Sequence, residues 1–133
     1  MKYMLDTNIC IYIIKKHPES VLKKFKTEMM GNIAISSITL AELRYGVQKS
    51  HHQQKNKSAL DEFIVPLEIF SFDENAAEYY GYIRADLEKK GKIIGSLDMM
   101  IAAHALSLGA ILVTNNKKEF LRVPKLTIED WVH

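Results

Sequence analysis

The amino-acid sequence predicts an α/β fold, a three-layer α/β/α sandwich with a central, mostly parallel sheet of four to five strands. Short apolar runs alternate along the chain with longer segments whose apolar residues repeat at helical spacing, which is typical of parallel sheets covered by helices. The run at residues 110–114 is almost entirely apolar, as expected for a strand buried on both faces. Because the 133 residues contain no linker or internal repeat, we expect one domain over residues 1–133.

The first strand, at residues 2–5, stops at Asp6, and either Thr7 or Asn8 can cap the helix that follows. His17-Pro18 ends that helix, because proline cannot continue it but suits the first position of the next one. The polar segment 49–57 is expected to be an exposed loop or helix end, with solvent-facing histidines. The elements predicted in the first half are a strand at 2–5, helices at 9–16 and 18–30, a strand at 33–35 and a helix that opens at Ser36 or Ser37.

The second half continues the alternation of strands and helices. Asp73 can cap a long helix that ends near Gly91, and Gly109 ends the helix after it. Between the strand at 110–114 and the last strand we expect only a turn. The predicted elements are a helix through Leu60 that ends near Pro66, a strand at 67–70, helices at 73–90 and 97–108, and strands at 110–114 and 126–128.

The composition is that of an ordinary globular chain and excludes several classes of protein. A net charge of +2, from 18 basic and 16 acidic residues, does not by itself indicate a nucleic-acid partner. The single cysteine, Cys10, excludes a disulfide framework and a cysteine zinc site, and we expect it to be a small buried hydrophobe. No apolar stretch approaches the roughly 18 residues that span a bilayer, and no secretory signal is recognisable. We therefore expect a cytoplasmic protein without a membrane partner.

Four acidic residues stand where parallel sheets place functional groups, beyond the carboxyl ends of strands and at the starts of helices. They are Asp6 after the first strand, Glu42 in the helix after the second, Asp98 at a helix start and Glu119 after the strand at 110–114. Because these positions share one sheet edge, the carboxylates can meet there. Clustered like charges repel unless a cation neutralises them, so the pattern indicates a site for Mg²⁺, with Mn²⁺ as a substitute. Such a site supports phosphodiester cleavage by a metal-activated water.

Each acid also has a structural explanation. Thr39-x-x-Glu42 matches a capping box, and Asp98 suits a helix N-terminus. Asp6 can cap the first helix, and Glu119 can be a solvated surface acid. These alternatives stay open for each residue taken alone, but the coincidence of all four at one predicted edge favours a functional cluster.

Five stretches, in order, carry a family pattern: residues 4–8, 36–46, 83–91, 94–105 and 112–116. With them the chain resembles the PIN-domain ribonucleases, specifically the toxins of VapBC-type toxin–antitoxin pairs. The resemblance implies an endoribonuclease in which Asp6 and Asp98 bind metal and Glu42 is a catalytic acid. It also implies a homodimer and a cognate antitoxin that occupies the acidic cleft. The RNA target it suggests first is the anticodon loop of initiator tRNA, whose cleavage inhibits translation.

One position departs from this family pattern. Many members carry an aspartate two residues after the threonine that closes the fourth strand, whereas this chain has Asn116 there. An amide adds no negative charge, so the sequence favours one firmly held metal over two. Glu119 could restore the missing carboxylate from about one helical turn further on.

Polar and basic residues near the acids are candidates for supporting roles. Those expected to orient carboxylates or metal-bound water are Thr7, Asn8, Ser96, Thr114, Asn115 and Asn116. Lys117, Lys118 and Arg122 could hold RNA phosphates, and Arg84 could do the same or pair with nearby acids. His104, six residues after Asp98, lies on a different helix face and is expected to be packed rather than catalytic. In the early helices, Ile11, Tyr12 and Ile14 could serve a dimer surface or the core.

Three other classes of protein are alternatives to a nuclease. A haloacid-dehalogenase-like phosphatase needs a second aspartate two positions after the first, and this chain has Asn8 there. A phospho-acceptor receiver domain needs an aspartate at the end of a mid-chain strand, whereas Asp73 opens a long helix. A non-catalytic interaction module predicts that Asp6→Asn and Asp98→Asn leave every activity unchanged.

Overall fold

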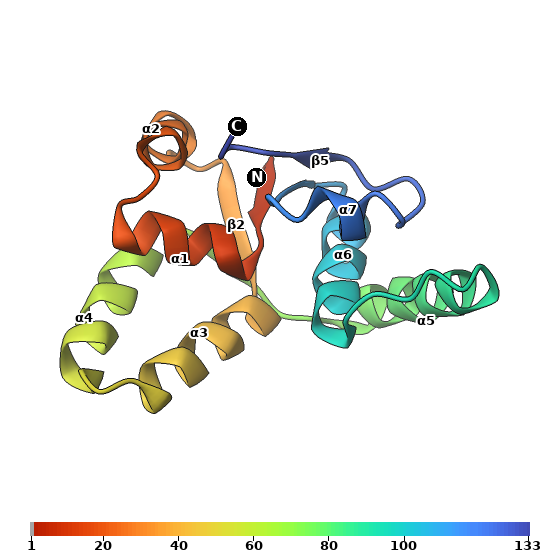
Figure 1. Ribbon diagram of the computed structural model, residues 1–133, viewed down its shortest axis with the longest axis horizontal. Helices are drawn as coiled ribbons and strands as arrows, with labels where there is room; N and C mark the ends of the chain where they lie inside the picture. The colour runs from red at the N-terminus through yellow and green to blue at the C-terminus, as the bar shows by residue number, and fades with distance from the viewer. Residues whose placement is uncertain (1) are drawn as a thin grey trace.

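A computed structural model describes residues 2–133, and its strands form one sheet in which all neighbours are parallel (Figure 1). The strands are β1 (Tyr3–Leu5), β2 (Ile33–Ser36), β3 (Glu68–Phe70), β4 (Ile111–Val113) and β5 (Ile128–Glu129). Their order across the sheet is β3-β2-β1-β4-β5, so the first strand of the chain lies at the centre. This confirms the predicted α/β class and the mostly parallel sheet.

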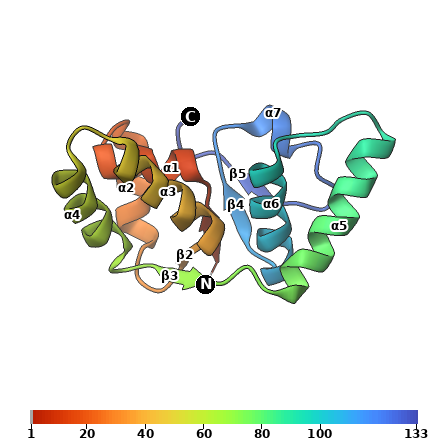
Figure 2. The same cartoon turned by 90° about the horizontal axis from the view of Figure 1, so that it is seen from below.

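Helices connect the strands and cover the sheet. They are α1 (Thr7–Lys15), α2 (Glu19–Glu28), α3 (Ser37–Lys49), α4 (Gln53–Ile64), α5 (Glu74–Lys89), α6 (Ser96–Leu108) and α7 (Lys117–Phe120). Figure 2 shows α1–α4 on one side of the strands and α5–α7 on the other. No helix within residues 2–133 is both long and apolar enough to cross a membrane.

The central strand supplies side chains to two separate cores. Tyr3 and Leu5 belong to a buried cluster with residues of α1–α4, whereas Met4 belongs to a second cluster with residues of α5 and α6. Side chains alternate between the two faces of a strand, so a strand covered on both faces must be apolar at every position. This is why the first strand is a continuous apolar run, in which all three residues are buried.

The start of the first helix confirms the alternative given for Asp6 and not the caps Thr7 and Asn8. α1 begins at Thr7, and its cap is Asp6, whose Oδ1 accepts a hydrogen bond from the Ile9 amide at 2.9 Å. The expected caps, Thr7 and Asn8, are already in the helix. Asp6 occupies the extended backbone conformation of a cap because it directly ends β1, so strand and helix join without an intervening loop. Asp73 caps α5 as predicted, with its Oδ1 3.0 Å from the Ala76 amide.

Segment 49–57 contains helix ends, one of the two expected alternatives, and its histidines are exposed as expected, whereas the turn predicted between β4 and β5 is wrong because it contains a helix. Most of segment 49–57 belongs to α3 or α4, and only residues 50–52 connect these helices. Burial of Leu60 and Phe63 holds α4 against the core, while its polar first turns face solvent. Between β4 and β5, where a turn was predicted, α7 forms because Phe120, only 1% exposed, anchors it in the second core.

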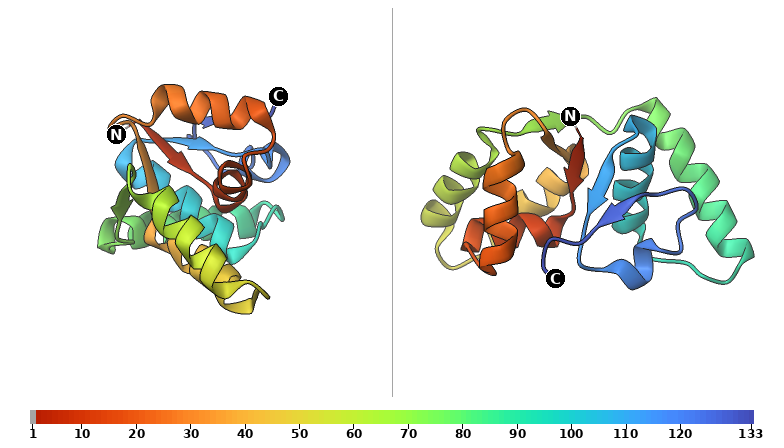
Figure 3. Two further views of the ribbon diagram at one scale, coloured as in Figure 1. Left: turned by 90° about the vertical axis from the view of Figure 1, so that its left-hand side faces the viewer. Right: turned by 90° about the horizontal axis from the view of Figure 1, so that it is seen from above.

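The parallel sheet brings three strand ends to one edge. β1, β2 and β4 are neighbours, and Asp6, Ser36 and Thr114 are the residues at their carboxyl ends. All three side chains are buried. Figure 3 shows α1 starting directly from the end of β1, and the segment between α5 and α6 passing beside α7. The fold therefore gathers α1, α3, α6 and α7 around this edge of the sheet.

His104 is packed, as predicted, and joins α6 to the end of β2. Its Nδ1 lies 2.7 Å from the Ser36 hydroxyl, and its ring meets Phe72 edge to face. The same hydroxyl accepts a hydrogen bond from the Ile38 amide at 3.0 Å, so it is free to donate to an unprotonated Nδ1. Burial lowers the pKa of His104, and the negative charge of Asp73 only partly opposes this.

This arrangement predicts an acid-sensitive contribution to stability. Below pH 6.5 the unfolded chain binds a proton on His104 more readily than the folded chain, so folding stability gained from the neutral ring is lost as the pH falls. His104→Asn keeps an acceptor near Nδ1 but does not titrate. We expect the wild type to lose stability relative to this variant between pH 7 and pH 5, measured by urea unfolding. Equal pH profiles would contradict the assignment.

Candidate active site

Asp6 lies at the centre of the sheet edge with only 5% of its surface exposed. Burial raises the pKa of its carboxyl, hydrogen bonds from Thr114 and the Ile9 amide lower it, and the charge of Glu42 raises it further. The net direction is upward. Asp6 therefore caps α1 and is also a buried carboxyl that lies close enough to Glu42 for the two acids to interact.

Asp98 and Glu119 form a close carboxyl pair at the start of α6 and in α7. Asp98 sits in the first turn of α6. The residue at the N-cap of this helix is Gly95, so no side chain caps the helix. The pKa of Asp98 is raised to about 7. Burial is the largest cause, and the hydrogen bond with Glu119 and the negative charges of Glu119, Asp6 and Glu42 raise the pKa further. A hydrogen bond between two carboxyls requires one shared proton, and the raised pKa of Asp98 favours the proton on Asp98 in the metal-free chain.

Glu42 is held by a residue from another helix. The Thr7 hydroxyl donates to Glu42 Oε1 at 2.7 Å, joining α1 to α3. The capping-box explanation of Glu42 is wrong, because α3 starts at Ser37 and Ser36 is its cap. The side chain of Glu42 is instead positioned toward the end of β1.

The four predicted acids therefore share one electrostatic environment. Asp6, Glu42 and Glu119 each raise the pKa of Asp98, so the four carboxyls lie close enough to interact electrostatically. As placed, no three His, Cys, Asp or Glu side chains among residues 2–133 lie in an arrangement that ligates an ion. Separate hydrogen bonds, such as that of Thr7 with Glu42, hold individual acids in this arrangement. The donor set itself, carboxylate oxygens with an excess of negative charge, fits a hard divalent cation.

Asn116 stabilises Glu119 directly. Its Nδ2 donates to Glu119 Oε2 at 3.0 Å, and its backbone amide donates to the Thr114 hydroxyl at 2.9 Å. An aspartate at this position would place another carboxylate against Glu119 with no donor between them. The amide thus gives Glu119 a neutral partner at the position where many family members carry a further charge.

The other polar candidates divide into two groups. Thr7, Thr114 and Asn116 contact the acids or each other, as described above. Asn115 instead donates to the Tyr12 hydroxyl at 3.0 Å and so links β4 to α1, away from the acids. Asn8 and Ser96 are exposed. The sequence placed all six near the edge, but only the structure shows which of them reach a carboxyl.

The basic candidates also divide. Arg84 pairs with Glu88 at 3.8 Å and donates to the Tyr80 hydroxyl at 3.0 Å, all on the surface of α5. This matches the predicted pairing with nearby acids. Lys117 lies 3.7 Å from Asp130, whereas Lys118 is exposed. Arg122 donates to the Ile93 carbonyl at 3.1 Å.

Asp130 is an acid at this edge that the sequence analysis did not select. It follows β5, its side chain is 7% exposed, and it accepts a hydrogen bond from the Val132 amide at 2.8 Å. The signal was available, because Asp130 follows a strand in the same way as Asp6. Its contact with Lys117 links the C-terminal segment to the start of α7, next to Asn116.

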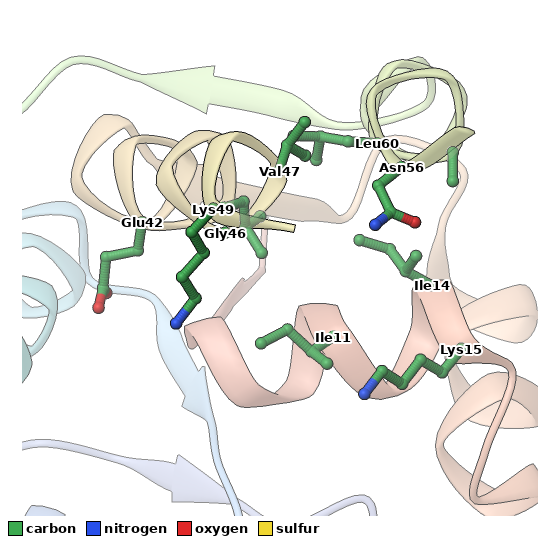
Figure 4. A pocket seen from close by; sticks show the side chains of 11 residues that line it. Ile11, Ile14, Lys15, Glu42, Gly46, Val47, Lys49, Asn56 and Leu60 are labelled. Atoms are coloured by element: carbon green, nitrogen blue, oxygen red, sulfur yellow. The ribbon is translucent and has the colours of Figure 1, made fainter. Parts of the chain in front are cut away.

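An apolar groove runs from the acidic edge between α1, α3 and α4 (Figure 4). It has a volume of about 350 Å³, and Glu42 lies at one end. Its floor includes Ile11 and Ile14, two residues considered from the sequence for a dimer surface. The lining residues are Ile11, Ile14, Lys15, Glu42, Leu43, Gly46, Val47, Lys49, Asn56, Ala59 and Leu60.

Comparisons with known proteins agree with this geometry. The PIN domain family matches residues 3–126. Ribonuclease VapC2 of Rickettsia felis is 53% identical over 132 residues, covering 98% of each chain. The tRNA(fMet)-specific endonuclease VapC of Shigella flexneri is 46% identical over 131 residues, again covering 98% of each chain.

Solved structures show the same fold in complexes. The VapBC2 complex from Rickettsia felis bound to a promoter DNA fragment contains a chain that superposes with a TM-score of 0.93 at 52% identity, covering 98% of this chain and 99% of that one. The DNA-bound VapBC of Salmonella typhimurium gives a TM-score of 0.94 at 46% identity, with 98% of each chain covered. These matches support neither a phosphatase nor a non-catalytic module. The chain therefore belongs to the PIN-domain family and, within it, to the VapC ribonucleases, the toxin components of VapBC toxin–antitoxin pairs.

Proposed function

We propose that this ribonuclease is a Mg²⁺-dependent endonuclease in which Asp6 and Asp98 hold the metal and Glu42 and Glu119 complete the acidic site. The observation that carries the proposal is that three other carboxyls, those of Asp6, Glu42 and Glu119, act on Asp98, whose pKa is raised to about 7. Such a concentration of acids is costly without a cation, and oxygen donors without cysteine or histidine favour Mg²⁺ or Mn²⁺.

The residues of the chain have distinct tasks in this proposal. A bound divalent cation would lower the pKa of the attacking water and stabilise the leaving oxygen of the phosphodiester. Asp6 is kept in place by the Ile9 amide, so its free carboxyl oxygen has little freedom to move. Glu42, fixed by Thr7 at 2.7 Å, accepts the proton of the attacking water. When Asp98 holds the metal as a carboxylate, the proton shared by the pair stays on Glu119, which is held by Asn116 and donates to Asp98 to orient it.

The proposed substrate is initiator tRNA, cut in the anticodon loop. A relative 46% identical over nearly the whole chain is named a tRNA(fMet)-specific endonuclease, which supports this choice. Single-stranded loops offer the unstacked bases that proteins read in RNA. Cleavage there would stop translation in the cytoplasm, which is the compartment we propose for the protein.

The cognate antitoxin neutralises the nuclease by covering the acidic edge in this proposal. The solved complexes with VapB partners support such a partner. The apolar groove beside Glu42 extends from the same edge and is open to a partner that reaches the site. A homodimer that uses the apolar faces of the early helices stays a prediction.

Removal of the metal is expected to abolish cleavage of RNA. In a chelator the carboxylates can no longer activate water, and added Mg²⁺ or Mn²⁺ should restore the products. The products can be located by sequencing RNA ends after brief expression, with Asp6→Asn as the control. Cuts in the anticodon loop of initiator tRNA that disappear in the variant support the proposal. Cleavage that persists in chelator, or in Asp6→Asn, would contradict it.

A further inference from the structure

A mixed basic and apolar surface adjoins the acidic edge where the segment before α6 meets the end of α7. We call it the α7 rim, and its residues are Lys92, Ile93, Leu97, Lys118, Leu121 and Arg122. Figure 2 shows the segment before α6 passing beside α7, and the hydrogen bond from Arg122 to the Ile93 carbonyl joins them. Leu97 directly precedes Asp98 and Lys118 directly precedes Glu119, so the rim is continuous in the chain with the carboxyl pair.

Arg122 is the fixed point of the rim. Its Nη1 donates to the Ile93 carbonyl at 3.1 Å, which ties the end of α7 to the segment before α6. A guanidinium has five N–H donors in a rigid plane, so this single bond leaves most of them available. No carboxylate lies within ion-pair distance of Arg122 in the described part of the chain. The guanidinium is therefore oriented but not neutralised.

The other cations of the rim also have no acidic partner among the residues that the structure describes. Lys92 and Lys118 are exposed, and neither forms an ion pair with any residue in the range 2–133. By contrast, Lys90 pairs with Asp86 at 2.9 Å, and Arg84 and Lys117 have the acidic partners described above. Unpaired positive charge is thus present beside the acids at the rim, as it is at other surface sites such as Lys15 and Lys49. An RNA strand that approaches four carboxyls needs positive charge nearby, because its phosphates and the carboxylates repel each other.

The rim also exposes aliphatic side chains. Ile93, Leu97 and Leu121 are 47%, 45% and 70% exposed, although each is large and apolar. A duplex presents mainly phosphates and sugars to a protein, whereas a single strand also presents the faces of unstacked bases. Cations next to exposed aliphatic groups therefore suit single-stranded RNA better than a helix.

We propose that the α7 rim binds the single-stranded RNA next to the scissile bond. Arg122, with Lys92 and Lys118, holds phosphates, and the aliphatic side chains pack against an unstacked base. This inference rests on the proposed function, because it identifies how the nuclease positions its substrate. The rim acts in positioning and takes no part in the chemical step.

The test measures RNA binding separately from cleavage. In an Asp98→Asn background with Mg²⁺, fluorescence anisotropy follows a short labelled single-stranded RNA at several salt concentrations. Arg122→Gln keeps an amide donor for the Ile93 carbonyl but removes the charge. We expect about tenfold weaker binding, as for one lost charge-assisted hydrogen bond, and a salt slope smaller by about 0.7. Arg84→Gln is the matched control, and its binding should change less than about twofold because Arg84 is already paired.

A second pair of measurements tests the apolar half of the rim. Leu121→Ser should weaken binding of the single strand without changing the salt slope, and its exposure makes a folding defect unexpected. An RNA duplex should compete poorly. Equal effects of Arg122→Gln and Arg84→Gln, or tight duplex binding unaffected by Leu121→Ser, would overturn the inference. If the wild type cleaved no RNA but the three variants changed RNA binding as expected, the result would count against the proposed function and not against RNA binding by the rim.

Discussion

Asp98→Asn is expected to lower the rate of RNA cleavage by at least about 100-fold while leaving the protein as stable as the wild type or more stable. The variant keeps the shape of the side chain and removes one of the two carboxylates proposed to hold the metal, and loss of such preorganised charge has effects of this size. Growth arrest on expression should be relieved for the same reason. The rate is measured with purified protein and RNA in Mg²⁺.

The stability part of this prediction follows from the pKa of Asp98. Because the folded-state pKa is raised to about 7 from an ordinary value of 3.8, the folded chain binds the proton more tightly than the unfolded chain. Stability contributed by this carboxyl is therefore present at low pH and is lost as the pH rises through about 7. In chelator, Asp98→Asn should unfold at a higher urea concentration than the wild type at pH 8, and this advantage should shrink at pH 5. An advantage that grows toward low pH would contradict the assignment.

Asp6→Asn and Asp6→Ala are expected to lose cleavage equally but to differ in stability. An asparagine oxygen can still accept the hydrogen bond of the Ile9 amide, so Asp6→Asn should keep α1 capped while losing at least about 100-fold in activity. Asp6→Ala also removes the cap, which costs about 1 kcal/mol of folding free energy. Urea unfolding and a cleavage assay on the same preparations separate the two roles of this residue.

The matched control for Asp6 is another capping aspartate. Asp73→Ala removes the bond to the Ala76 amide and should destabilise the protein by about 1 kcal/mol while leaving RNA cleavage intact. If Asp73→Ala reduced cleavage as strongly as Asp6→Ala, lost stability alone would explain both effects. Wild-type activity in Asp6→Asn would remove this carboxylate from the proposed site.

The sequence predicted the strands and most of the helices because their patterns are local. The buried first strand, the helix capped by Asp73 and the helix that ends at Gly109 each appear in a short window of residues. It failed where tertiary burial overrides local polarity. α7 forms because Phe120 fills a core made by distant elements, and the helix predicted through Leu60 begins earlier, in the polar segment, because Leu60 and Phe63 are buried.

The sequence by itself determined that four acids lie near one sheet edge, because parallel strands share the direction of their ends. Only the tertiary structure decided how these acids are held. Thr7 and Glu42, which hydrogen-bond, lie 35 residues apart, and Asp98 and Glu119 come from different helices. The distances between such groups depend on how whole helices pack against the sheet. No local pattern records that packing, so the carboxyl pair, the neutral partner Asn116 and the α7 rim became visible only in three dimensions.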